Sequence, residues 1–271
     1  MNYISLFKTE IKKFKNNSTV VLLFTVFSLL MPFVILLGKS ILKKDSGPLP
    51  SSQILYEFPT VWDYQGYVGN WLVFFFLGFM VLHMYNSEIS YKTMRQNIIA
   101  GYTKWEYYIG KVVGVLLLSI YATLIYTISS SIMGMISTPG FDMDLMIDSN
   151  YAPLRFFLMT LGYLSFAFLV ATIFKKGGLS MFFYFSYALI LESILRYGYL
   201  YFVKHQSANY FPLNAIEDNM TFPLIRSSND FFNTNYDFEL VNSFVIAGGL
   251  SLFYTIVFFV LAWYRIKKTD I

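Results

Sequence analysis

Residues 112–135 read VVGVLLLSIYATLIYTISSSIMGM, and none of these side chains carries a charge. An α-helix rises about 1.5 Å per residue, so roughly 20 apolar residues cross the ~30 Å hydrocarbon core of a bilayer. The stretch is long enough for such a crossing. No alternation of period two, separated by regular turns, runs through the sequence, which argues against a β-barrel. The stretch therefore predicts a membrane-spanning helix.

The composition of the whole chain agrees with this interpretation. Of its 271 residues, 56% are hydrophobic and only 13% are charged, and the mean hydropathy is +0.53. A soluble domain usually carries about 25% charged residues. These values exclude an ordinary cytosolic enzyme, a disordered protein and a coiled coil. The chain has no cysteine, so disulfides, thiolate chemistry and cysteine-based zinc or iron–sulfur sites are excluded as well.

Similar charge-poor apolar stretches recur along the chain. We predict an all-α integral membrane protein with six transmembrane helices, forming one membrane domain over residues 18–271. The predicted spans lie near residues 18–38, 67–85, 112–135, 156–174, 179–203 and 241–263. A cytoplasmic connection over 86–110 follows the second span, and a long outer segment over 204–240 precedes the last one.

Lysine and arginine set the predicted orientation, because cytoplasmic loops carry an excess of them. Most of the 20 basic residues fall in the N-terminus, the 86–110 connection with its flank, Lys175–Lys176 and the C-terminus. Both termini are therefore predicted to be cytoplasmic in a multi-pass protein of the cell membrane. A cluster in the first outer loop breaks the rule locally: Lys39, Lys43 and Lys44.

The first 17 residues have an amphipathic pattern. Ile4, Phe7 and Ile11 share one helix face, and lysines occupy the other. This pattern favours an interfacial helix in the headgroup layer of the membrane. The alternative is a solvated basic tail before the first span.

The connection over 86–110 reads NSEISYKTMRQNIIAGYTKWEYYIG. It predicts a short helix from Ser90, as N-cap, to about Ala100, stopped by Gly101. A second helix is predicted after Thr103, with Glu106 completing a capping box. In the short helix an apolar patch is surrounded by polar side chains; the patch is Met94, Ile98 and Ile99, and the polar residues are Lys92, Arg95, Gln96 and Asn97. Such a helix is either a docking element for a cytoplasmic partner or an elbow lying on lipid.

No catalytic, cofactor-binding or metal-binding motif is evident in the sequence. Gly38-Lys39-Ser40 ends like a Walker A motif but lacks the earlier glycine. His83 and His205 lie in different segments and without a metal-ligand spacing. No nucleic-acid partner is predicted, because the basic residues flank spans.

Two opposite charges fall inside the predicted fifth span. Glu192 and Arg196 are four residues apart and so share one helix face. An isolated charge at the bilayer centre costs about 2.5–3.5 kcal/mol on insertion scales. We favour a structural intramembrane pair that neutralises itself. The alternatives are a substrate route or gate, and a break in the span near Glu192 that moves both charges outward.

The layout resembles the membrane subunit of ABC-2 type ABC transporters. The local match comprises Glu88, residues 93–97 (TMRQN), residues 101–106 (GYTKWE) and Gly110-Lys111. The resemblance implies that a coupling helix docks on a separate ATP-binding subunit; its residues would be Thr93, Met94, Arg95, Gln96, Asn97, Ile98, Ile99 and Gly101. It also implies that two permease chains form an export pathway in the lipid bilayer.

The same resemblance implies that ATP and Mg²⁺ belong to the partner subunit, so this chain is neither an enzyme nor a cofactor-binding protein. An ion- or proton-coupled carrier or channel that works alone is the alternative. That alternative needs more intramembrane charges than Glu192 and Arg196, and inverted repeats, which are not evident. The sequence does not identify the cargo.

Overall fold

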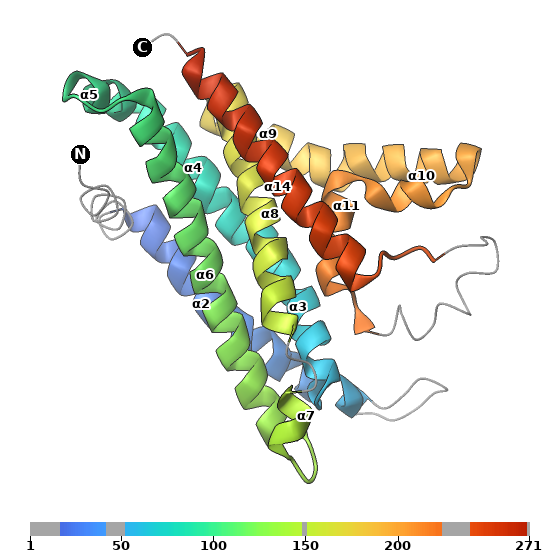
Figure 1. Cartoon of the computed structure of the whole chain (residues 1–271). Coiled ribbons are helices and arrows are strands. Elements are labelled where there is room, and N and C mark those ends of the chain that lie inside the picture. Colours follow the sequence, from blue (N-terminus) through green and yellow to red (C-terminus); the bar gives the residue numbers. More distant parts are fainter. Residues whose placement is uncertain (1–16, 42–51, 148–150, 224–238, 270–271) are drawn as a thin grey trace.

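The computed structural model describes residues 17–41, 52–147, 151–223 and 239–269, and the regular structure within these ranges is helical. The helices form a tilted bundle (Figure 1). Its long members are α2 (Ser18–Ile41), α3 (Thr60–Leu72), α4 (Gly78–Ser90), α6 (Lys104–Ser137), α8 (Ala152–Phe174), α9 (Gly177–Ser186), α10 (Glu192–Val203) and α14 (Phe244–Lys267).

Five runs of helix are long and apolar enough to cross a membrane: Thr60–Ser90, Lys104–Ser137, Met143–Phe174, Gly177–Val203 and Phe244–Lys267. They cover the second to sixth predicted spans, and several extend beyond the predicted ends. The first predicted span corresponds to α2, whose described apolar stretch, Ser18–Phe33, is shorter. A count of six spans therefore stays a prediction. The interfacial helix predicted over 1–17 lies outside the described residues, apart from Asn17.

Short elements connect the long helices. They are η1 (Ser52–Tyr56), η2 (Val73–Leu77), α5 (Thr93–Ile99), α7 (Met143–Ile147), η3 (Tyr187–Leu191), η4 (Gln206–Tyr210), α11 (Pro212–Glu217) and η5 (Asp218–Met220). The π-turn η2 joins α3 to α4. The outer segment over 204–240 contains η4, α11 and η5 in its first half, so that half is folded against the bundle rather than a plain loop.

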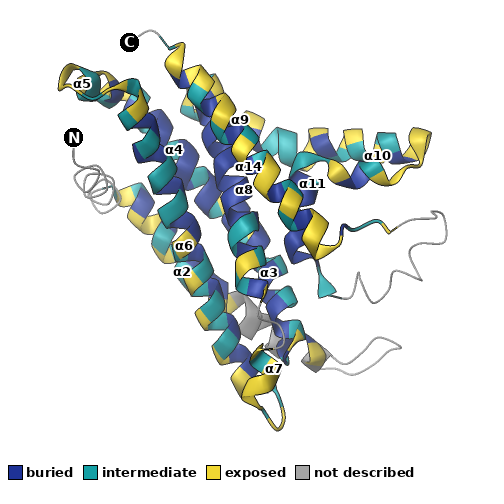
Figure 2. Ribbon diagram, viewed as in Figure 1, coloured by how far each residue is buried: buried dark blue, intermediate teal, exposed yellow. Residues whose placement is uncertain are grey.

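Helix α8 occupies the centre of the bundle. In the most apolar part of its run 83% of the residues are buried, compared with 33% for α6 and 22% for α14. Figure 2 shows the same difference, with α8 mostly dark and α14 banded in yellow. Small residues along α8, including Gly162, Ser165 and Ala167, let neighbouring helices approach closely. The remaining long helices therefore expose one face, as lipid-facing helices do.

The predicted fifth span is not one straight helix. After α9 the backbone passes through the π-turn η3, and α10 then points away from the bundle (Figure 1). A π-turn inserts a residue into the hydrogen-bond ladder and is a known cause of kinks. The bend agrees with the alternative of a break near Glu192. The run as a whole, Gly177–Val203, is still long and apolar enough to cross a membrane, so the fifth span over 179–203 stays a prediction.

Three parts of the chain gather at one end of the bundle. They are the start of α2, the short helix α5 and the end of α14, while α7 lies at the opposite end (Figure 1). The connection over 86–110 and the C-terminal end of α14 therefore share one side, as the predicted orientation requires.

Gly69 offers a test of the packing. A Cβ atom there would lie 2.6 Å from Met31 Cε and 2.6 Å from the Phe156 ring. That ring stacks on Tyr126 with centroids 4.1 Å apart, so it has little room to move. Overpacked core substitutions cost about 1–3 kcal/mol. We expect Gly69→Ala to lower the free energy of unfolding in detergent by that amount.

Gly249→Ala is the matched control, since nothing lies within 4 Å of a Cβ atom at that position in α14. It should be neutral or slightly stabilising, because alanine is the better helix former. Equal stability of the two variants in a denaturant titration would contradict the packing described for Gly69.

Candidate functional site

The short helix α5 stands at the end of the bundle between α4 and α6. Helix α4 continues through Ser90, and Lys92 then takes a left-handed backbone with φ 57°. The Lys92 N–H donates to the Ile89 carbonyl at 3.0 Å, which closes the end of α4. The prediction that Ser90 caps the short helix is therefore wrong, because the left-handed residue that ends α4 lies two positions later.

The far end of α5 is closed by Gly101, as predicted. Its φ of 101° is a conformation that favours glycine. The Gly101 N–H donates to the Ile98 carbonyl at 3.0 Å, and the Tyr102 N–H donates to the Asn97 carbonyl at 3.1 Å. These two hydrogen bonds form a Schellman motif, which fixes how the chain leaves the helix.

Helix α6 begins with the predicted capping box. The Glu106 N–H donates to Thr103 Oγ1 at 3.1 Å, and the Thr103 N–H donates to Glu106 Oε2 at 2.8 Å. Only the two residues between Gly101 and Lys104 separate the Schellman motif from α6. Both ends of this short link are therefore hydrogen-bonded, which fixes the position of α5 relative to the start of α6.

The two faces of α5 differ from the prediction. Met94 is buried against the bundle and Ile98 packs partly beside it, whereas Ile99 is 77% exposed. The predicted apolar patch of these three residues is thus divided between the inner and outer faces. Thr93 and Asn97 are half-buried. The exposed residues in and beside the helix, which we call the α5 outer face, are Tyr91, Lys92, Arg95, Gln96, Ile99, Ala100 and Gly101.

A buried ion pair between α4 and α6 lies next to α5 and holds these two flanking helices together. Lys111 Nζ on α6 lies 2.5 Å from Glu88 Oε1 on α4. The Tyr107 hydroxyl donates to Glu88 Oε2 at 2.9 Å. Buried charges persist in proteins when they are paired and hydrogen-bonded. The sequence analysis did not identify this pair, although two opposite charges just inside the facing ends of consecutive spans could have indicated it.

The start of α6 is also attached to the end of α14. Lys104 Nζ donates to the Lys267 carbonyl at 3.1 Å and to the Thr269 carbonyl at 2.8 Å. Trp105 packs edge-on against Trp263 with centroids 4.7 Å apart. The start of α6, which follows α5 closely in the chain, therefore contacts a second long helix.

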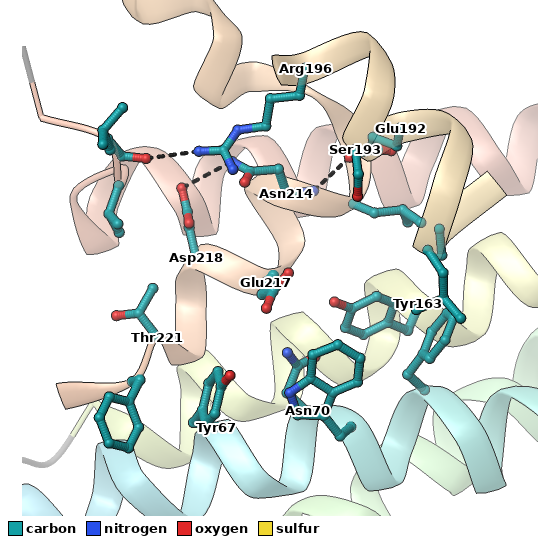
Figure 3. A pocket seen from close by; sticks show the side chains of 18 of the residues that line it. Tyr67, Asn70, Tyr163, Glu192, Ser193, Arg196, Asn214, Glu217, Asp218 and Thr221 are labelled. Carbon is teal, nitrogen blue, oxygen red and sulfur yellow. Dashed lines mark hydrogen bonds between the residues drawn. The ribbon is translucent and has the colours of Figure 1, made fainter. Parts of the chain in front are cut away.

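The second candidate site surrounds Glu192 and Arg196. Among the described residues no direct ion pair joins their side chains, although the two charges still attract each other, so the self-neutralised pair stays a prediction. Glu192 Oε1 accepts a hydrogen bond from the Asn214 N–H at 2.7 Å. Arg196 donates to Asn209 Oδ1 at 3.2 Å and to the Leu240 carbonyl at 3.0 Å. Both charges thus attach α10 to the outer segment (Figure 3).

These residues line a cavity of about 310 Å³ between α3, η3, α10 and α11. Two further carboxylates, Glu217 and Asp218, line it, and Asn70 and Tyr163 face them from below in Figure 3. Burial raises the pKa of the Glu217 carboxyl, and the positive charge of Arg196 acts against that shift. The sequence analysis gave only a long outer segment over 204–240, which contains Glu217 and Asp218, and did not bring them to Glu192.

The contact of Glu192 gives a second prediction. Glu192→Gln keeps an oxygen that can accept from the Asn214 N–H, so it should unfold at nearly the wild-type denaturant midpoint. Glu192→Leu leaves that donor without its acceptor, which costs about 1–3 kcal/mol for a buried group. A chemical denaturation series on both purified variants tests this. Severe destabilisation by Glu192→Gln would show that its negative charge holds the fold.

A comparison with known protein families finds a match. Residues 6–191 match the family described as ABC-2 family transporter protein. The matched region includes α5 and its flanks, and it ends one residue before Glu192. No curated protein matches the chain.

Proposed function

The chain belongs to the ABC-2 family of transporter proteins, and on this premise we propose that it is the permease subunit of an ATP-driven exporter. A separate ATP-binding subunit would hold ATP and Mg²⁺, and a second permease copy or a homologue would complete the pathway. The α5 outer face would bind the ATP-binding subunit. The cell membrane is the proposed location.

The observation that carries this proposal is the construction of α5. A seven-residue helix is too short to be stable alone, yet this one is fixed by a Schellman motif, a capping box and a buried ion pair beneath it. It keeps a large apolar side chain, Ile99, 77% exposed beside Arg95. Exposed apolar and arginine side chains are typical of binding hot spots on rigid elements.

The proposed coupling follows the contacts of α5. Closure of the ATP-binding subunits would displace α5, and the short link to Thr103 would pass this displacement to α6. The Lys104 contacts would carry it to the end of α14. A second path runs through Glu88 and Lys111 to α4. Relative movement of these helices would open or close the route for substrate.

Coexpression with the candidate ATP-binding subunit tests the proposal. We expect the two chains to copurify in detergent, and we expect the ATPase rate of the complex to respond to α5 variants. Proteoliposomes of the permease alone should not transport in response to an ion or proton gradient. Gradient-driven transport without an ATP-binding subunit would favour the carrier alternative instead.

A further inference from the structure

The cavity beside α10 has an excess of negative side chains. Three carboxylates line it, from Glu192, Glu217 and Asp218, and Arg196 is the one basic residue among its described lining residues. Asp218 accepts from the Asn242 N–H at 2.8 Å and from Asn214 Nδ2 at 3.4 Å. Glu217, in contrast, accepts no hydrogen bond from the described part of the chain.

Two other lining residues carry buried oxygens without a partner among the described residues. Glu192 is 4% exposed, and its Oε2 makes no hydrogen bond. Asn70 is 2% exposed, and its Oδ1 makes none either. Among the described lining residues, Arg196 Nε is the one buried donor without a partner, so unsatisfied acceptors outnumber unsatisfied donors. An unsatisfied buried acceptor costs about 1–3 kcal/mol, so this balance favours a donor as the occupant.

The shape and lining of the cavity indicate an organic donor. No group of three or more metal-ligating side chains occurs among the described residues, so the carboxylates are too dispersed for a metal ion. The volume of about 310 Å³ suits a larger group. Aromatic rings of Tyr67, Trp71 and Phe222 complete the wall, and such rings attract ammonium and guanidinium groups.

We propose that this cavity binds an organic cation, an ammonium or guanidinium group, with Glu217 as its main counter-ion and Glu192 Oε2 and Asn70 Oδ1 as acceptors. In Figure 3 the Glu217 carboxylate points into the space between α11 and the Asn70–Tyr163 wall. The binding of the cation is argued from the cavity alone. The further step, that this cation is transported as cargo, rests on the proposed function.

The test uses the purified full chain in dodecyl maltoside, with 2-phenylethylammonium and the uncharged 2-phenylethanol as probes. Ligand-observed NMR titration should show the ammonium binding at least about tenfold more tightly, since one ionic contact commonly contributes that factor. Glu217→Gln should remove most of this preference. Asp144→Asn, which changes an exposed carboxylate on α7 outside the cavity, should leave it unchanged.

Equal binding of the two probes to the wild-type chain would contradict the proposal that the ligand is a cation. This comparison needs only the wild-type chain, so it holds even if Glu217→Gln does not fold. A folded Glu217→Gln chain that binds the ammonium like the wild type overturns the site. Competition by short-chain phosphatidylethanolamine would identify the cation as a lipid headgroup, and lack of competition would identify a soluble cation. Copurification with the ATP-binding subunit is measured separately. The proposed function can therefore fail while cation binding is confirmed, and cation binding can fail while the proposed function is confirmed.

Discussion

Replacing Ile99 by aspartate should strongly weaken the assembly of the permease with its ATP-binding subunit. Ile99 is 77% exposed on the α5 outer face, so the change should leave the fold of the chain intact. In the complex the new carboxylate would be buried without a partner. Loss of a hot spot costs about 2–4 kcal/mol, or roughly a 30- to 1,000-fold weaker dissociation constant. Affinity measurements on the two purified subunits test this.

Ile147→Asp is the matched control for this variant. Ile147 is 56% exposed on α7, at the opposite end of the bundle. It should assemble with the ATP-binding subunit like the wild type. Unchanged affinity of the Ile99→Asp chain, with an intact fold, would mean that α5 is not the docking element.

Removing Glu88 should have the largest effect on stability. The Glu88→Leu change takes away the carboxylate that faces Lys111 in a nearly buried position. Breaking a buried ion pair on one side costs about 3–5 kcal/mol. Denaturation of the purified chain in detergent should show this loss of stability. Stimulation of the ATPase by the permease should also fall, because the ion pair that supports α5 is missing.

The double change, Glu88→Leu with Lys111→Met, provides the comparison. Replacing both charges by apolar side chains of similar size is often neutral for stability, so the double variant should recover most of what the single one loses. If the single and double variants are equally unstable, the charge interaction is not what holds α4 to α6.

Local patterns in the sequence predicted much of α5 correctly. The Gly101 stop and the Thr103–Glu106 capping box involve residues a few positions apart, so their chemistry is visible in the sequence. The long apolar helices followed from charge-free stretches for the same reason. Ser90 was assigned wrongly because cap propensity does not show whether the preceding helix has already ended.

Contacts between distant segments could not be predicted in this way. Glu192 and Arg196 are in helical register, yet their partners Asn214, Asn209 and Leu240 come from the outer segment. The bend at η3 that makes these contacts possible lies in residues 187–191, which read YALIL and resemble any apolar helix. The cavity likewise joins α3 to α11, which are well over 100 positions apart in the sequence.

The central claim is that the α5 outer face meets a cytoplasmic ATP-binding subunit. The natural chain has no cysteine, so single cysteines report one position each. Arg95→Cys should react with a membrane-impermeant maleimide only after the cells are opened, and bound ATP-binding subunit should then protect it. Asp144→Cys, at the opposite end of the bundle, should react in intact cells. Labelling of the Arg95→Cys chain in intact cells would contradict the account.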